Sequence, residues 1–511
     1  MSGPRSDNLE RERKLAGWAG FELPDLGEVI DGVIAVVLPE QHLEATYYDA
    51  ADLRLARSGI TVRFRTGDTG RARQKGKWTV KLPDGESGPT LVRREIDIEA
   101  PGRVVPEAVA SLVRAHIRST PMVAVGVLST RRRRMHLKSE NGTSLVEVAD
   151  DEVSVLEGRR VALRFRELEV EVLDHDGGAD LLERVVDVLT AAGAASADQT
   201  PKIVRALGPR ALAPPEVVVP VLDDSATLSD VVRAATAAGF ARLLQHDPGV
   251  RLGGDIEDVH QARVAARRLR SDLRTFRKLL DPERASPLRD ELQWLGAELG
   301  HVRDADVLLE RLQHQATLLP AVDARAVAGL LRRLEAQRKT AGATLLAALD
   351  SDRYRRLLDL LVEAIERPPV NDDAFAQARG ALPDIVRGPW KHLRDAVDAL
   401  VEHPEDEALH DIRIRAKRAR YAAEAAAPVM GKPAQRFAKA VAGVQSVLGD
   451  LQDAVVAEDW LRNAGSKGPA AQALVAGQLI AVQRDAMETS RRSWAEAWHE
   501  VAGKKLRSWL S

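Results

Sequence analysis

The sequence predicts an α+β protein whose N-terminal part is an antiparallel β-sheet and whose C-terminal part is a helical bundle. From Leu9 to about Leu173, short runs rich in Val, Thr and Ile alternate with polar residues between Gly, Pro and Asp, which is typical of antiparallel strands. From Leu228 onward, apolar residues recur at spacings of three and four over long segments, which indicates packed helices. We therefore expect two domains, at residues 1–206 and 225–511.

The segment between the strands and the bundle has its own pattern. Residues 180–195 and 202–207 have the spacing of helices. A Pro-rich stretch then follows, with Pro209, Pro214 and Pro215 among its residues. Because closely spaced prolines favour extended backbone, we expect a linker over residues 207–224.

The composition excludes several classes of protein. The chain has 74 Lys+Arg, 76 Asp+Glu and no Cys, so disulfides, thiolate-bound metals and thiol nucleophiles are excluded. No segment resembles a signal peptide or approaches the roughly 18 apolar residues that span a bilayer. A sequence pI of about 6.7 and only 4% aromatic residues disfavour nucleic-acid binding. We expect a soluble, cytoplasmic protein with neither nucleic-acid nor membrane partners, whereas its oligomeric state stays open.

The helical half contains an internal duplication. His260-Gln-Ala-Arg263-Val-Ala-Ala-Arg267-Arg recurs 150 residues later as His410-Asp-Ile-Arg-Ile-Arg-Ala-Lys417-Arg. The segment 299–305, Leu-Gly-His-Val-Arg-Asp-Ala, recurs 149 residues later as Leu-Gly-Asp-Leu-Gln-Asp-Ala. Two matches in the same register predict two similar helical repeats, at about residues 225–365 and 374–511.

Rows of charge follow the predicted strands. Side chains two residues apart share one face of a strand, as do Glu167, Glu169 and Glu171. For a single strand, a solvent-facing side of a sheet explains such a row. Across seven strands, however, rows of mostly one sign favour a closed sheet whose lumen holds a polyanion with a divalent metal. The other rows are Glu10/Glu12/Lys14, Arg63/Arg65, Lys77/Thr79/Lys81, Arg93/Glu95/Asp97, Arg132/Arg134 and the single Glu147.

The order of these residues resembles the CYTH family, also called triphosphate tunnel metalloenzymes. The resemblance covers roughly residues 8–206 and begins with an ExExK motif at Glu10, Glu12 and Lys14. It continues through Tyr47-Tyr48-Asp49, Arg63-x-Arg65, Lys81, Arg93-x-Glu95, Thr130 to Arg134, Glu147, Glu167-x-Glu169 and Lys202. The resemblance implies an eight-stranded antiparallel tunnel that binds triphosphate groups with Mg²⁺ or Mn²⁺. The family includes inorganic, thiamine and RNA triphosphatases and a class of adenylate cyclases.

The resemblance also implies roles for individual residues. We expect Glu10, Glu12, Lys14, Lys81 and Glu169 to be catalytic, and Glu10, Glu12, Glu147, Glu167 and Glu169 to hold the metals. The remaining expected triphosphate contacts are Arg63, Arg65, Arg93, Arg132, Arg134 and Lys202. Alternation alone leaves open which pair of Arg131–Arg134 faces inward, and we favour Arg132 and Arg134.

Two predicted helices carry rows of cations beside an apolar stripe. Seven Lys/Arg and one acid lie between Val259 and Leu280, and five Lys/Arg and one acid lie between Leu409 and Tyr421. A solvated helix face usually mixes both signs, so these rows indicate a binding surface. The helices resemble the CHAD domain, an α-helical family, over about residues 225–511. That resemblance implies binding of inorganic polyphosphate in a basic groove between the repeats. The expected contacts are His260, Arg263, Arg267, Arg270, Arg303, His410, Arg413, Lys417 and Arg420, with Lys432, Arg436 and Lys439 as weaker candidates.

Some of these residues have an alternative explanation. His260 and His410 could equally be hydrogen-bonded structural residues, although each precedes a row of Arg by one turn. We expect Asp304, Asp306 and Asp453 to be ion-pair partners or helix caps rather than metal ligands.

Three functions follow from the two resemblances. The leading hypothesis is a Mg²⁺-dependent triphosphatase, acting on inorganic triphosphate or polyphosphate ends, with an attached polyphosphate-binding module. The second is a non-catalytic protein that localises to polyphosphate. The third is a tunnel enzyme directed at nucleotides or thiamine triphosphate. Under the first two hypotheses, we expect a cytoplasmic protein associated with polyphosphate granules.

Overall fold

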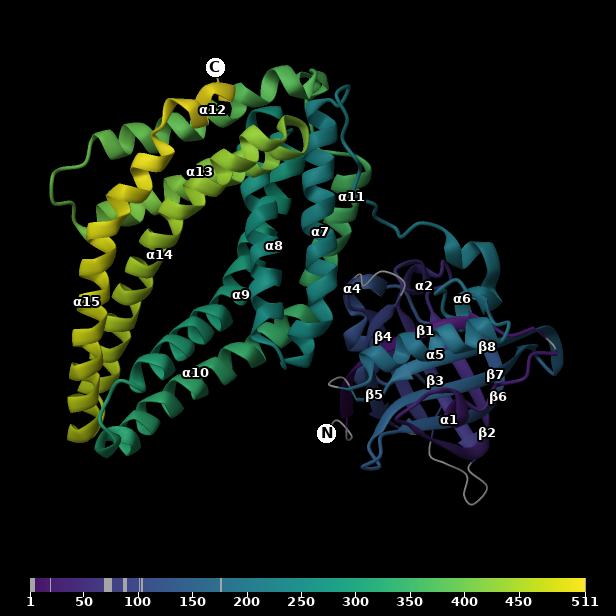
Figure 1. Ribbon diagram of the computed structural model, residues 1–511. Coiled ribbons are helices and arrows are strands. Elements are labelled where there is room, and N and C mark those ends of the chain that lie inside the picture. Colours follow the sequence, from purple (N-terminus) through teal and green to yellow (C-terminus); the bar gives the residue numbers. More distant parts are fainter. Residues whose placement is uncertain are drawn as a thin grey trace. The chain divides into compact units, whose positions relative to one another are not determined.

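The computed structural model describes residues 5–510, except for 19, 69–75, 86–89, 101, 103 and 175–176. The chain divides into two compact units, Met1–Glu216 and Val217–Ser511 (Figure 1). Among the described residues, no helix combines the length and the apolar character that crossing a bilayer requires.

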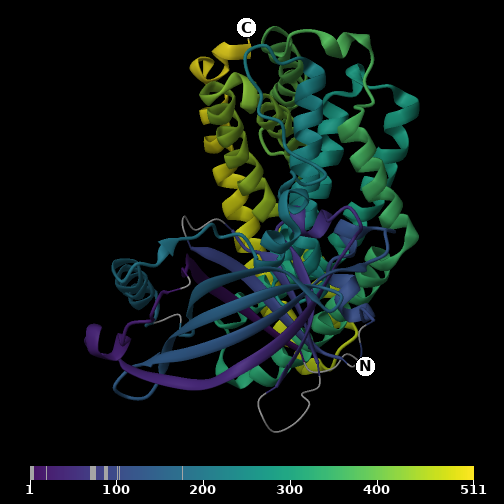
Figure 2. The same ribbon diagram turned by 90° about the vertical axis from the view of Figure 1, so that its right-hand side faces the viewer.

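The first unit is built on a closed antiparallel barrel. The hydrogen-bonded order is β5-β4-β3-β2-β6-β7-β8-β1, and β1 pairs again with β5, which closes the sheet; the two-residue β9 adds to β1. This confirms the predicted eight-stranded tunnel, whose strands curve around one another in Figure 2. The strands are β1 (Arg5–Ala16), β2 (Ile34–Asp49), β3 (Thr61–Asp68), β4 (Lys77–Pro83), β5 (Leu91–Glu99), β6 (Val123–Lys138), β7 (Ser144–Glu157), β8 (Arg160–Val172) and β9 (Ala195–Ser196).

The apolar core of this unit lies outside the barrel. Alternation along β8 puts Leu168, Val170 and Val172 on its outer face, where they pack against α5 (Ala179–Ala191). A second core lies under α6 (Lys202–Leu207), α2 (Arg54–Arg57) and η1 (Gly208–Leu212). Because apolar side chains point outward, the alternate, polar side chains point into the lumen. Three short helices complete the unit: α1 (Leu26–Val29), α3 (Glu107–Leu112) and α4 (Arg114–Ile117).

One predicted helix is too long and one expected linker is partly packed. The helix expected over residues 180–195 ends at Ala191, because Gly193 has φ 101° and residues 195–196 form β9. Beyond α6, the chain remains on the barrel unit as far as Glu216, which accepts two hydrogen bonds of 2.6 Å from Arg118. Arg57 also donates to the backbone oxygen of Pro214 at 2.7 Å.

The second unit is all helical and repeats one arrangement. The helices α7–α10 correspond in order to α12–α15, and α9 and α14 each have 35 residues. The helices are α7 (Leu228–Leu252), α8 (Ile256–Thr275), η2 (Arg277–Leu279), α9 (Pro282–Ala316), η3 (Ala321–Asp323), α10 (Ala324–Asp350), α11 (Asp352–Glu366), η4 (Asp372–Phe375), α12 (Ala378–Asp398), α13 (Asp406–Met430), α14 (Lys432–Ser466), α15 (Ala470–Val501) and η5 (Lys504–Leu510).

The two repeats contact each other at several places. Thr227 and Gln377, which precede α7 and α12 and are 150 residues apart, form an antiparallel bridge. The long hairpins α9–α10 and α14–α15 meet at their far ends (Figure 1). There, Leu312 and Leu334 pack with Leu461 in one apolar cluster. The basic helices α8 and α13, one from each repeat, also pack against each other.

Asp49, the last residue of the Tyr47-Tyr48-Asp49 motif, anchors the turn after β2. Its buried carboxylate accepts backbone hydrogen bonds from Ala50 at 2.6 Å, Leu55 at 3.0 Å and Ala56 at 2.9 Å. Substitution of Asp49 by Ala leaves these donors unpaired, so we expect the barrel to lose about 2–3 kcal/mol of unfolding free energy. Hydrogen exchange of β2 and β3 peptides measures this loss. The matched control is Asp52→Ala, whose exposed carboxylate pairs with Arg54; an equal effect of both substitutions would contradict the assignment.

Candidate functional site

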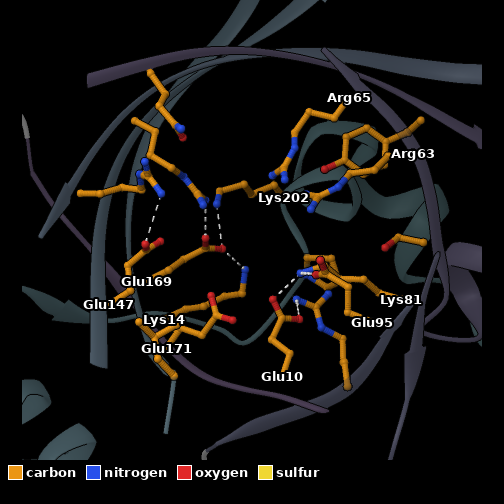
Figure 3. Close-up of a pocket in the computed structure, with 18 residues that line it drawn as sticks. Glu10, Lys14, Arg63, Arg65, Lys81, Glu95, Glu147, Glu169, Glu171 and Lys202 are labelled. Atoms are coloured by element: carbon orange, nitrogen blue, oxygen red, sulfur yellow. Dashed lines mark hydrogen bonds and ion pairs between the residues drawn. The ribbon is translucent and has the colours of Figure 1, made fainter. Parts of the chain in front are cut away.

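The barrel encloses a charged cavity of about 290 Å³. Figure 3 shows its lining side chains pointing toward one another across the lumen. Eight cations and five carboxylates line it, and the excess of positive charge suits an anionic ligand. The charged lining residues are Glu10, Lys14, Arg63, Arg65, Lys81, Arg93, Glu95, Arg132, Arg134, Glu147, Glu169, Glu171 and Lys202.

Most of the tunnel residues expected from the sequence therefore lie together at one cavity. Two of them, Glu12 and Glu167, are 2% and 0% exposed and do not line it. Both lie within ion-pair distance of Lys14. They are thus part of the buried wall behind the cavity.

Lys14 is the centre of a buried ion-pair network. Its ammonium lies 3.0 Å from Glu167, 2.9 Å from Glu169 and 3.7 Å from Glu12. Burial opposes the charge of Lys14, but Glu12, Glu169 and Glu167 outweigh burial and raise its pKa. The same carboxylates would repel one another without this cation.

A second network joins β1, β4 and β5. Lys81 pairs with Glu10 and lies 2.7 Å from Glu95, while Arg93 pairs with both Glu10 and Glu12. Burial works against the charge of Glu95, but Lys81 and Arg63 outweigh it and lower its pKa to about 2. Glu95 was part of the family motif, yet the sequence prediction gave it no role in the site.

Arg63 and Arg65 differ from the other cations, because neither makes an ion pair with another described residue. Arg63 hydrogen bonds with Tyr47. The neighbouring charge of Arg63, followed by burial, lowers the pKa of Arg65 to about 10. Both guanidinium groups point into the cavity in Figure 3. Two adjacent cations that have no acid at ion-pair distance among the described residues are the arrangement that an incoming anion would stabilise.

The structure decides between the alternating arginines of β6. Arg132 and Arg134 line the cavity, whereas the side chains of Arg131 and Arg133 are 52% and 45% exposed. Arg132 donates two hydrogen bonds to Asp151, at 2.8 and 2.6 Å.

Asp151 is a residue of the site that sequence reasoning missed. It is fully buried and also accepts a 2.6 Å hydrogen bond from Lys202. Lys202 begins α6 directly after Pro201, whose φ of −57° suits a helix start. Asp151 thus holds Arg132 and Lys202 side by side. Its signal in the sequence was weak, because Asp150 and Asp151 are adjacent and alternation does not say which one faces inward.

Strand register also gives two carboxylate neighbours to Glu171, a member of the predicted row on β8 that had no assigned role in the site. Glu171 on β8 lies opposite Glu12 on β1 and Glu147 on β7, so three carboxylates are neighbours across three strands. Burial and then Glu10 raise the pKa of Glu171 to about 8. Crowded carboxylates of this kind attract a cation.

The donor set suits a divalent metal, although its geometry is not preassembled. Carboxylate oxygens are the ligands that Mg²⁺ prefers. One oxygen each of Glu10 and Glu167 is buried without a hydrogen-bond partner, although Arg93 lies 3.2 Å from the first and Arg205 lies 3.3 Å from the second. Within the described part of the chain, however, no three His, Asp or Glu side chains are grouped for a metal. Most of the expected metal ligands are instead in ion pairs with Lys or Arg. Glu10, Glu12 and Glu169 are examples.

A second cluster of cations lies in the helical unit. Burial, followed by Arg267 and Arg413, lowers the pKa of Lys417 to about 7. Arg263 and Arg413 lie against Gly300 and Gly449, equivalent residues of the two repeats, within 3.7 Å of where a Cβ would stand. The absence of these two side chains leaves room for the guanidinium groups beside α9 and α14.

Other expected polyphosphate residues lie around this cluster. Arg303 and His260 are close enough that Arg303, after burial, lowers the pKa of His260. Arg267, Arg270 and Lys417 line a cavity of about 540 Å³. His410 has a buried Nδ1 without a hydrogen-bond partner.

The remaining candidates are engaged elsewhere or lie apart. Arg420 donates to Glu424 at 2.7 Å and to Gln445 at 3.1 Å. Lys432, Arg436 and Lys439 are exposed on α14 and line neither cavity.

The three aspartates of this region lie close to cations. Asp304 pairs with Arg263 at 2.7 Å, and Asp306 pairs with Arg338. Burial raises the pKa of Asp453, and the charge of Arg413 is the largest effect that opposes this rise.

A closed barrel with a charged lumen and a duplicated basic helical unit define a CYTH domain followed by a CHAD domain. Residues 8–204 match the model of the CYTH domain and residues 234–462 match that of the CHAD domain. An uncharacterised protein of Mycobacterium tuberculosis (strain H37Rv) is 33% identical over 495 residues, which cover 90% of each chain. The chain therefore belongs to the family in which a CYTH domain is fused to a CHAD domain, and its N-terminal unit is a triphosphate-tunnel domain.

Two solved structures are similar to parts of the chain. PptA from Streptomyces chartreusis is 27% identical with a TM-score of 0.46, covering 54% of this chain and 100% of its own. The CHAD domain from the plant Ricinus communis is 27% identical with a TM-score of 0.42, covering 58% of this chain and 96% of its own.

The network around Lys14 predicts a pH-dependent loss of stability. Lys14→Met leaves buried carboxylates without their cation, so we expect the barrel to lose about 3–5 kcal/mol near neutral pH. Burial then raises the pKa of these carboxyls, and a group with a raised pKa stabilises the fold only while protonated. The loss should therefore be smaller near pH 5 than near pH 8. Urea unfolding with pulsed hydrogen exchange of β1 and β8 peptides measures it. Lys138→Met on β6 is the control, and an equal loss at both pH values would contradict the network.

Proposed function

We propose that this protein is a metal-dependent triphosphatase that hydrolyses inorganic triphosphate, or the ends of polyphosphate, inside the tunnel. The observation that carries the proposal is the cation pair Arg63 and Arg65, which lack carboxylate partners among the described residues and point into a closed, charged cavity. The cavity has almost no apolar wall for a base or a thiazole ring, so a bare phosphate chain suits it best.

Substrate binding would exchange the partners of the charges in the tunnel. Phosphate oxygens first meet Arg63 and Arg65 and then compete for Lys81, Arg93, Arg132, Arg134 and Lys202. Each cation that turns to a phosphate releases a carboxylate. Glu10, Glu12, Glu147, Glu167 and Glu169, with Glu171 added by the strand register, would then hold the metal.

The chemistry follows from this arrangement. When bound, Mg²⁺ or Mn²⁺ supplies neutralisation of phosphate charge and lowers the pKa of a bound water. The cations of the chain hold the phosphoryl oxygens and offset the charge that builds up on them. Lys14, which is not among the cations that turn to phosphate, stays with Glu167 and Glu169 and is therefore a positioning group for these two carboxylates.

The helical unit would bind longer polyphosphate through Arg263, Arg267, Arg413 and Lys417. Burial and repulsion by neighbouring arginines lower the pKa of Lys417, as expected for a cluster whose cations outnumber its acids and that therefore lacks balancing negative charge. A chain of phosphates supplies that charge at regular spacing without needing a base-stacking surface. In this proposal, residues 1–206 perform the hydrolysis, residues 225–511 hold the polymer, residues 207–224 join them, and the protein associates with polyphosphate granules in the cytoplasm.

A phosphate-release panel tests the proposed activity. The substrates are inorganic triphosphate, long polyphosphate, ATP and thiamine triphosphate, each with Mg²⁺, Mn²⁺ or EDTA. We expect triphosphate to be hydrolysed fastest and EDTA to abolish release. If triphosphate yields no phosphate while polyphosphate still binds, the protein is a non-catalytic binder. Faster release from ATP or thiamine triphosphate would instead place those compounds as substrates.

In that panel, Arg65→Ala tests whether hydrolysis needs the arginines that line the tunnel rather than those on the outer face of the barrel. Arg65 makes no ion pair with a described carboxylate, so its removal leaves no buried charge unpaired. We expect kcat/KM for triphosphate to fall by roughly 10²-fold with an unchanged unfolding free energy. Arg133→Ala, on the exposed face, is the matched control and should keep its full rate. Equal rates for both variants would exclude hydrolysis in the tunnel.

The pKa of Lys417 predicts that polyphosphate binding weakens with rising pH. Above pH 7, free Lys417 is mostly neutral, so binding must protonate it, and affinity should fall by up to about tenfold per pH unit. Lys417→Arg stays charged and should flatten this dependence between about pH 7 and 9. Titration calorimetry with defined polyphosphate measures it, with the exposed Lys391→Arg as control. A flat profile in the unmodified protein would refute the assignment.

A further inference from the structure

The crossing of α8 and α13 places related residues in two different environments. Arg268 and Arg418 are equivalent positions 150 residues apart on these two helices. Arg268 reaches Glu424 of α13, whereas Arg418 lies beside Arg274 of α8. Because Glu424 is 150 residues beyond Arg274, the two sides of the crossing can be compared position by position.

On the Arg268 side, the charges neutralise one another. Arg268 pairs with Glu424 and lies 3.1 Å from Asp272. Its guanidinium is 5.6 Å from the ring centroid of Tyr421. Glu424 also accepts a 2.7 Å hydrogen bond from Arg420. On this side two arginines are therefore matched by two acids, which leaves no excess of formal charge to attract a ligand.

On the Arg418 side, both acids are replaced. The residue equivalent to Asp272 in the second repeat is Ala422. The residue equivalent to Glu424 in the first repeat is Arg274. The helical unit is described over residues 217–510, and in it neither Arg418 nor Arg274 makes an ion pair. Burial, followed by Arg274 and Arg415, lowers the pKa of Arg418. This side carries unneutralised positive charge.

A cavity of about 560 Å³ opens beside Arg418. Five Lys/Arg line it against two Asp; of these groups, Asp384 already pairs with Arg387, and Arg415 pairs with Asp411 at 2.6 Å. The other walls are largely apolar and come from the C-terminal end of α8, from η2 and from α12. The lining cations are Arg274, Arg277, Lys278, Arg415 and Arg418, and the apolar lining is Phe276, Leu279, Ile385, Gly388 and Pro389.

This pocket differs from the tunnel in size and chemistry. The tunnel cavity is about half as large, at about 290 Å³ against about 560 Å³, and is lined mainly by charges. A bare phosphate chain would leave the apolar walls of the larger pocket in contact with water. A ligand that fills it carries an anionic group together with an apolar, ring-sized body.

We propose that this pocket binds a nucleoside polyphosphate, with its phosphates at Arg274, Arg277 and Arg418 and its base against Ile385, Gly388 and Pro389. The guanidinium planes at the rim can also stack on the base. The neighbouring cavity shares Arg274, Arg277 and Arg418 with this pocket and reaches Lys417. The nucleotide is thus a second ligand class, bound beside the proposed polyphosphate site and apart from the tunnel.

Hydrogen exchange with ATP tests this proposal on the full-length protein, in EDTA to suppress hydrolysis. We expect ATP to slow exchange in peptides covering residues 271–279, 384–392 and 414–421. Calorimetry should give at least about a tenfold weaker ATP affinity for Arg418→Ala. Arg332→Ala, an exposed arginine of α10, is the control with the same change of charge and should bind normally.

Gly388→Leu tests the apolar half without changing any charge. A Cβ at Gly388 meets no atom within 4 Å, and leucine is a better helix former than glycine, so the variant should fold. We expect it to weaken ATP binding by at least about tenfold while leaving inorganic triphosphate binding unchanged. Both pocket variants should keep the wild-type rate of triphosphate hydrolysis, so this result is independent of the proposed tunnel activity.

Three outcomes would overturn the proposal. ATP could protect only the tunnel peptides, Gly388→Leu could bind ATP as tightly as the unmodified protein, or triphosphate could protect the pocket as well as ATP does. The last outcome would make the pocket an extension of the polyphosphate groove.

Discussion

The barrel depends on pairing buried charges of opposite sign across its lumen. Lys14 holds three glutamates, while Lys81 holds Glu10 and Glu95 and Arg93 holds Glu10 and Glu12. A barrel that buries polar side chains inside must carry its apolar core outside, which is why α5 and α6 pack on the outer faces of its strands. Ion pairs therefore stabilise the interior of the barrel. An anion and a cation that enter together can replace those ion pairs without leaving a buried charge unpaired.

Much of the barrel could be predicted because its alternation is regular. Rows such as Glu167, Glu169 and Glu171 have a period of two, and the choice of a charged lumen over a solvent face followed from their number. The role of Glu171 could not be read in the same way, because it comes from register: only the pairing of β8 with β1 and β7 shows that it adjoins Glu12 and Glu147. The pairing of Asp151 with Arg132 and Lys202 likewise joins segments far apart in the chain.

The helical half shows what periodicity leaves out. Spacing put Arg420 in the same row as Arg413 and Lys417, yet Arg420 is engaged by Glu424 one turn later. The spacing of four residues between Arg420 and Glu424 was visible in the sequence. This ion pair engages Arg420 even though it shares a helix face with the other cations. The duplication predicted equivalent positions, but equivalence of backbone does not imply equivalence of charge, as Arg268 and Arg418 demonstrate. A repeated fold can thus hold a closed ion-pair cluster at one position and an open cationic pocket at the other.

The closing strand of the barrel has a consequence for biosynthesis. β1 pairs with β5, but its last residues pair with β8 and β9, up to residue 196. Loop closure over such a separation is entropically costly, so this pairing is a late step. The residues of β1 from Glu12 to Ala16 must therefore wait for nearly the whole domain to be made. The charged side chains of β1 keep it hydrated during that interval, so the residues suited to bind phosphate also protect the nascent chain from aggregation.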